Sequence, residues 1–199
     1  VRGLNKRLVG ASVLAQNCNK GSVTLNTRSP EGKASFLRLA KDADVLATNV
    51  RPAGMRRLGL GFEQLAEVNP RLIYASMVGF SQRGPYAPKA AYDDMIQAAT
   101  GLAAAVGAAS GGEPRYLPIT IADRSVGLYA FGVISAALYA RERTGVGQSI
   151  DIPMFETMIP YVLGDHLYGH TFDPPKGGFG YPRLMSPNRR PYKTKDGYV

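Results

Sequence analysis

Short apolar segments alternate with helix-like segments over residues 20–80, and this alternation limits the fold more than any other feature. GSVTLN predicts a short strand, and SPEGKASFLRLAKDAD predicts a helix, with Pro30 where a first helical turn tolerates proline. DVLATNV and RLIYASMVGF predict buried strands on either side of GFEQLAEVNP, a short helix that Asn69 and Pro70 end. Strands and helices in this order are typical of a parallel sheet, so we predict an α/β fold.

The second half of the chain predicts longer helices around one more strand. YDDMIQAATGLAAAVG predicts a single helix that ends in a glycine-rich loop. The stretch from Tyr116 to Gly145 supplies a long helix to about Arg143, and QSIDIPM predicts the strand that follows. A last helix is expected from Phe155 to about His170, before a segment rich in Gly, Pro and Tyr.

Composition favours a folded chain without disulfides. The 199 residues are 45% apolar and 20% charged, which is typical of a globular protein. Cys18 is the single cysteine and cannot form an internal disulfide, so we expect a reducing compartment, the cytoplasm. We find no apolar run of the roughly 18 residues that a membrane span needs, and therefore expect no membrane association.

The net charge of +9 favours anionic partners. The basic residues are scattered, however, and do not form the block or aromatic-interleaved stripe that nucleic-acid binders show. We therefore expect phosphorylated small molecules rather than nucleic acid as partners.

Metal and hydrolase chemistry find little support in the residue patterns. His166 and His170 are spaced to share one helix face, but no third ligand is near them in the sequence. We also find no G-x-G-x-x-G, P-loop or G-x-S-x-G motif. We expect no metal.

Asp123 stands at the start of the long helix and has two possible roles. Asp is a preferred N-cap residue, and a cap would stabilise the helix by about 0.5–2 kcal/mol. The same helix end favours the ionised carboxylate, and this is the form that attacks an acyl carbon. Gly127, one turn on, leaves space for such a substrate. A nucleophilic role requires the Asp123 carboxylate to face an accessible cleft.

Six segments of the chain, taken in order, resemble the class III CoA-transferase family. They are QNCNKGSVTLNTRSPEG, ADVLATNVRPAGMRRLGLGFEQLAEVNPRLIYASMVGF, GP, AYDDMIQAATG, IADRSVG and RTGVGQSIDIPMFE. The resemblance runs from about Gln16 to Val199 and implies a Rossmann-like parallel sheet and interlocked dimers.

Proteins of that family are longer, so the resemblance implies a central portion that would be inactive alone. On this reading, residues 1–155 form the large CoA-binding domain without its N-terminal strand–helix unit. Residues 156–180 form a linker helix, and residues 181–199 begin a truncated small domain.

The resemblance implies that Asp123 is the nucleophile of a CoA-transferase. It would form an acyl–aspartyl anhydride while CoA stays bound. Asp93 matches a family acid near the nucleophile and would orient an acyl group or bind a proton; on local grounds it is equally a solvated cap beside Asp94. Tyr92 stands where the family's racemases have an essential histidine, and a phenol with a pKa near 10 is a poor base.

The resemblance also implies a coenzyme A site. Arginine suits the phosphates of CoA because its planar fork donates two hydrogen bonds to one oxyanion. The matching positions are Leu25, Arg28, Asn49, Arg51, Arg57 and Tyr92.

Two alternatives for function remain open, and one observation bears on the acceptor. An acyl-CoA racemase or epimerase of the same family is weakened by Tyr92. A catalytically silent CoA-binding module would tolerate replacement of Asp123. Residues 182–197 lack the glycine run of formyl-CoA transferase, which argues against oxalate as the acceptor.

Overall fold

The computed structural model describes residues 10–199, and the chain divides into two compact units, Val1–Arg38 and Leu39–Val199. The first unit contains α1 (Ala11–Gln16) and most of α2 (Pro30–Lys41), the helix expected after Pro30. Ser29 Oγ accepts a hydrogen bond from the Gly32 N–H at 3.1 Å and so satisfies a free amide in the first turn of α2. The strand predicted at 21–26 is wrong, because this irregular segment finds no partner strand within residues 10–199.

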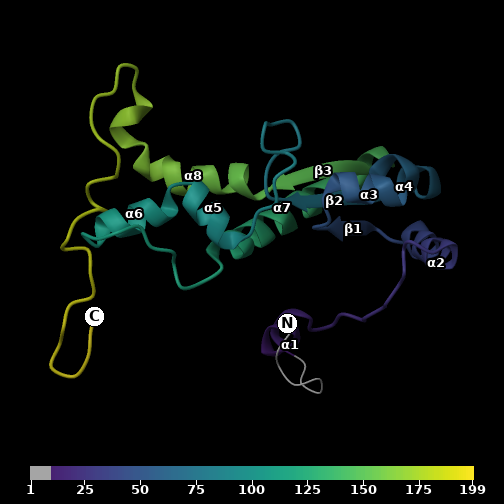
Figure 1. The fold of residues 1–199 in the computed structure, drawn as a ribbon, viewed down its shortest axis with the longest axis horizontal. Coiled ribbons are helices and arrows are strands. Elements are labelled where there is room, and N and C mark those ends of the chain that lie inside the picture. Colours follow the sequence, from purple (N-terminus) through teal and green to yellow (C-terminus); the bar gives the residue numbers. More distant parts are fainter. Residues whose placement is uncertain (1–9) are drawn as a thin grey trace. The chain divides into compact units, whose positions relative to one another are not determined.

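A parallel sheet forms the centre of the second unit (Figure 1). Its strands are β1 (Val45–Thr48), β2 (Ile73–Val78) and β3 (Gln148–Pro153), in the order β1-β2-β3. The register pairs Val45 with Ile73 and Ile73 with Gln148. All three strands were predicted from the sequence, and their parallel pairing is confirmed.

Helices connect the strands as crossovers. α3 (Pro52–Leu58) and α4 (Phe62–Val68) join β1 to β2, whereas α5 (Asp93–Ala99), α6 (Leu102–Ala109) and α7 (Ile121–Thr144) lie between β2 and β3. α8 (Met154–His166) and a 3-10 turn, η1 (Tyr168–Thr171), follow β3.

Two details differ from the sequence-based expectations. Helix α3 was not predicted, although Pro52 at its first turn and left-handed Gly59 after its end are signals of a helix. The single helix expected near residues 92–107 is two helices, because Gly101 takes a φ of 81° and turns the chain between α5 and α6.

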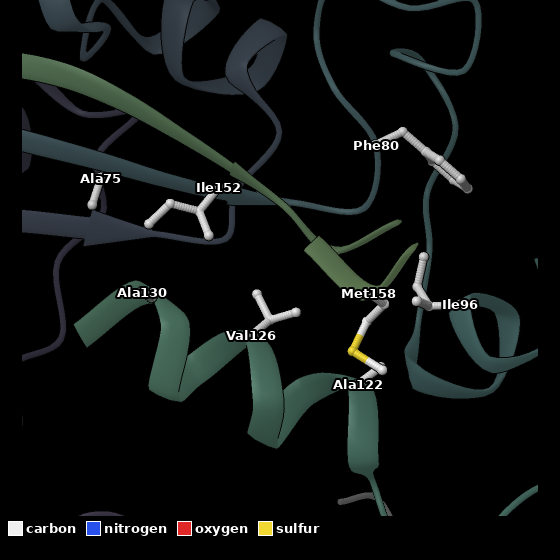
Figure 2. Packing of buried hydrophobic residues seen from close by; sticks show 8 residues of the cluster. All are labelled: Ala75, Phe80, Ile96, Ala122, Val126, Ala130, Ile152 and Met158. Atoms are coloured by element: carbon white, nitrogen blue, oxygen red, sulfur yellow. The ribbon is translucent and has the colours of Figure 1, made fainter. Parts of the chain in front are cut away.

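One face of α7 packs against the sheet. Ala122, Val126 and Ala130 recur every four residues and contact a core that also contains Ala75 of β2 and Ile152 of β3 (Figure 2). Ile96 of α5, Met158 of α8 and Phe80 complete this cluster.

The C-terminal end of α7 is fastened to the amino edge of the sheet by Arg141. Its buried guanidinium forms a 2.9 Å ion pair with Asp44 Oδ1, just before β1. It also donates to the Asp44 and Arg71 carbonyls at 3.3 Å, just before β1 and β2. The N-terminus of α7 therefore lies at the carboxyl edge of the sheet.

By length and composition, one helix of the described chain, α7, is able to cross a membrane. The sequence argument that no segment reaches this length was therefore wrong, because small Ala, Gly and Ser residues keep the helix sufficiently apolar without a continuous run. A single such helix is weak evidence for a span, since core helices pass the same test. One face of α7 packs in the core, but only 28% of its apolar window is buried.

Candidate active site

A glycine contact brings the candidate acids to the carboxyl edge of the sheet. The loop after β2 leaves at Gly79 and returns at Ala91, and a Cβ on Gly79 would lie 2.5 Å from Ala91 Cβ. Only glycine lets the two backbones approach this closely. The contact places Tyr92 and Asp93, at the start of α5, beside the end of β2. Ligands commonly bind at this edge of parallel sheets.

Asp93 is buried, with 6% of its surface exposed, and it caps α7 from another helix. Its Oδ1 accepts a hydrogen bond from the Asp123 N–H at 2.9 Å. Thr120 occupies the N-cap position of α7 but makes no side-chain capping bond. The interpretation of Asp123 as the cap is therefore wrong, because its side chain projects from the first turn while Asp93 satisfies its amide. The interpretation of Asp93 as a solvated cap is also wrong, because its side chain is buried.

The Asp123 carboxylate itself is exposed and has no hydrogen bond or ion pair with any residue from 10 to 199. Partial desolvation raises the pKa of Asp123, the Asp93 carboxylate raises it further, and Arg124 opposes both. A carboxylate without partners, whose charge its surroundings disfavour, is disposed to react or to accept a proton.

Asp123 lies on an open surface. A cavity of ≈740 Å³ lies between β3 and the middle of α7, and Asp123 is not among the residues that line it. The carboxylate is accessible, and the expectation that it faces a cleft stays a prediction. Gly127 presents open space on the same face, since a Cβ there would meet nothing within 4 Å. This agrees with the space expected one turn from Asp123.

The sequence analysis missed Gln97, which is fully buried on α5. Its Nε2 donates to Asp93 Oδ2 at 2.6 Å and to the Ile119 carbonyl at 3.3 Å. Its Oε1 accepts from the Leu117 N–H at 2.9 Å. Gln97 thus joins Asp93 to the loop that leads into α7. The only sequence signal was the four-residue spacing from Asp93, which puts both side chains on one helix face.

The residues expected to bind CoA lie in both units. Asn49, Arg51 and Arg57 are exposed beyond the end of β1, and Arg51 Nη1 donates to the Pro88 carbonyl at 3.2 Å. This bond joins the segment after β1 to the loop that carries Tyr92, whose side chain is 77% exposed.

Leu25 and Arg28 belong to the first unit, where Leu25 is partly buried and Arg28 is exposed. The roles of all six residues, like those of Asp93 and Asp123, stay predictions.

No group of three or more His, Cys, Asp or Glu side chains in the described ranges is arranged to hold a metal ion. His166, which the sequence raised as a possible ligand, accepts a 3.4 Å hydrogen bond at Nδ1 from the Tyr181 N–H. This bond links α8 to the C-terminal segment.

The chain is similar to known CoA-transferases over most of its length. The family described as CoA-transferase family III matches residues 2–199. Over 146 residues the chain is 44% identical to an acetyl-CoA:oxalate CoA-transferase of Acetobacter aceti, covering 73% of this chain and 38% of that protein. Over 197 residues it is 33% identical to a succinate–glutarate CoA-transferase of Agrobacterium fabrum, covering 98% and 48%.

A solved structure shares the fold. A CAIB/BAIF family protein from Brucella suis superposes with a TM-score of 0.77 at 35% identity, covering 90% of this chain and 47% of that one. The chain thus spans less than half the length of these proteins.

Proposed function

The chain belongs to CoA-transferase family III, and from this premise we propose that the whole protein moves coenzyme A from an acyl-CoA thioester to a carboxylic acid. The observation that carries the proposal is the accessible Asp123 carboxylate, which has no bonding partner at the start of a helix whose amide Asp93 already caps. The backbone is thereby held while the side chain stays available for reaction.

The proposed reaction uses Asp123 as a covalent nucleophile. A carboxylate oxygen attacks the thioester carbon, the C–S bond breaks, and CoA leaves as a thiolate. The acceptor carboxylate then attacks the aspartyl carbonyl of the mixed anhydride and displaces the donor acid. Finally the CoA thiolate attacks the acceptor acyl carbon, which releases the new thioester and frees Asp123. Each step exchanges one acyl bond for another, so no external energy source is needed.

We propose that CoA lies along the carboxyl edge of the sheet. Arg51, just after β1, and Arg57, in the last turn of α3, are both exposed and suit its phosphate groups. Asn49 and Tyr92, in the same unit, complete the proposed set. Leu25 and Arg28 belong to the first unit, and their contacts with CoA stay predictions. No metal takes part in the proposed reaction.

The acceptor is proposed to be a small dicarboxylic acid. The similar proteins are named for oxalate and for succinate and glutarate. The acceptor panel must therefore include oxalate beside the longer acids.

We further propose that the protein acts as a homodimer. An anhydride must be shielded from water, yet Asp123 lies on an open surface of this chain. The outer face of α7 supports burial by another copy, because Leu128, Phe131 and Tyr139 are 76%, 74% and 65% exposed. The family's interlocked arrangement would supply such cover, and the described chain alone would be inactive. The single cysteine supports a cytoplasmic location.

Acyl exchange by the whole protein tests this function. Acetyl-CoA or succinyl-CoA is incubated with oxalate, succinate or glutarate, and new thioesters are separated by chromatography. Hydroxylamine added during turnover should trap the anhydride as a hydroxamate on Asp123, identified by peptide mass spectrometry. Asp123→Ala should abolish transfer while CoA still binds, whereas Asp94→Ala, at an exposed neighbouring acid, should retain transfer. Turnover by Asp123→Ala would remove the nucleophile assignment.

A further inference from the structure

Gln97 connects three parts of the site although its side chain contacts no solvent. Its amide has one donor group and one acceptor, and both are used. The Nε2 group reaches Asp93 Oδ2 and the Ile119 carbonyl, while Oε1 takes the Leu117 N–H. Each of these bonds fixes either the acid that caps α7 or the loop from which α7 begins.

The bond to Asp93 determines which carboxylate oxygen is left for α7. Because Gln97 occupies Oδ2 at 2.6 Å, Oδ1 is directed to the Asp123 amide at 2.9 Å. A buried carboxylate needs such donors, since an unpaired buried charge is costly. Gln97 and the Asp123 amide therefore hold Asp93 between them.

We propose that Gln97 is a positioning residue that fixes the nucleophile Asp123 through Asp93; this inference rests on the proposed transferase function. It touches no reacting atom. Its effect is to hold the first turn of α7 still relative to α5, so that the Asp123 side chain keeps one direction. A catalytic group displaced by about 1 Å loses on the order of 100-fold in rate.

Three variants of the whole protein test the proposal. Gln97→Met keeps a similar length while removing every hydrogen bond of the amide. Thr100→Val is the matched control, because Thr100 is the buried C-cap of the same helix. Its hydroxyl donates to the Ile96 and Gln97 carbonyls at 2.7 and 3.4 Å and not to Asp93. Asp93→Ala removes the acceptor through which Gln97 is proposed to act.

We expect Gln97→Met to lower kcat by about 10- to 100-fold with KM nearly unchanged. Thr100→Val should leave kcat unchanged, even if it lowers the thermal midpoint as much as Gln97→Met does. In the double variant with Asp93→Ala, the loss should be far smaller than the product of the two single losses. A loss of kcat in the double variant equal to the product of the two single losses would show that Gln97 acts independently of Asp93. This result would overturn the proposal.

Backbone amide hydrogen exchange separates this inference from the proposed function. Exchange at Asp123 should quicken in Gln97→Met and stay slow in Thr100→Val, whether or not the protein transfers CoA. Unchanged exchange at Asp123 in Gln97→Met would refute the positioning role. A wild-type protein that transfers no CoA, with the exchange pattern as expected, would refute the transferase and leave the clamp on α7 standing.

Discussion

Asp93 Oδ1 lies 2.9 Å from the backbone nitrogen of Asp123, so one acid caps the helix that carries the other. This contact explains how the chain keeps two carboxylates close together. The buried Asp93 is satisfied by the Asp123 amide and by Gln97, while the Asp123 side chain remains exposed. The two acids therefore differ in environment: Asp93 is buried and bonded to the backbone of α7, whereas the Asp123 carboxylate is exposed.

Removing the charge of Asp93 should shift the pH dependence of transfer. The Asp93 carboxylate is one of the causes that raise the pKa of Asp123, so Asp93→Asn should lower that pKa. Because only ionised Asp123 attacks, the acid limb of the kcat–pH profile should move to lower pH. Asp94→Asn should leave the limb in place. A shift of the limb to higher pH would contradict the charge interaction.

Neutralising Asp123 should stabilise the protein even though it abolishes transfer. The folded-state pKa of Asp123 is raised, so the folded protein holds the carboxylate charge less favourably than the unfolded chain does. Asp123→Asn should therefore raise the thermal midpoint at pH 7, and the gain should vanish below about pH 4, where unfolded Asp is also protonated. Thermal unfolding of both proteins between pH 4 and 7 tests whether the substitution raises the midpoint. Equal midpoints at every pH would contradict it.

Two glycines of α7 offer a matched pair of substitutions. A Cβ on either Gly127 or Gly132 would meet nothing within 4 Å, so alanine at each should stabilise the helix by about 0.5–1 kcal/mol. Only Gly127→Ala should slow transfer, because its methyl group enters the space one turn from Asp123. Chemical denaturation and steady-state kinetics measure the two effects. Equal rates in both variants would show that substrate does not use this space.

Loss of Arg57 should weaken CoA binding. Its exposed guanidinium would lose a charge-assisted hydrogen bond to a phosphate, so Arg57→Ala should cost about 1–3 kcal/mol of binding free energy. Added salt should narrow the difference because it screens the interaction. Isothermal titration with CoA gives the dissociation constants, and Arg143→Ala controls for net charge at an exposed site on α7. An unchanged dissociation constant would make Arg57 an ordinary surface residue.

Arg141 should contribute more to stability than the exposed ion pairs around it. Arg141→Met loses the Asp44 pair and the bonds to two carbonyls, so we expect a loss of about 1.5–3 kcal/mol in the free energy of unfolding. Glu142→Gln removes the ion pairs that the exposed Glu142 carboxylate forms with Arg71 and Arg141. This change should cost less than about 1 kcal/mol of unfolding free energy. Urea unfolding of both variants compares them. Equal losses would contradict the anchoring of α7.

Local sequence patterns were sufficient to predict an element wherever the residues of that one segment specify it. The apolar runs of β1, β2 and β3 and the long helix α7 were predictable because each buries a regular face. The strand expected at 21–26 failed because a strand also needs a neighbour, which that segment lacks within the described chain. Gly101 had a visible signal as a possible break, but only its φ of 81° showed that α5 and α6 are separate.

The sequence by itself determined the three strands and the long helix of an α/β fold, since these depend on residue types and their spacing along the chain. The resemblance of whole segments to a known family indicated the family and the nucleophilic role of Asp123. Only the tertiary structure decided what Asp93 and Gln97 do. Asp93 and Asp123 are 30 positions apart, and no periodicity of one helix relates them. Packing of α5 against α7 buries Asp93, and a buried carboxylate must find donors where the fold supplies them; here these are the Gln97 amide and the unpaired first-turn amide of the neighbouring helix.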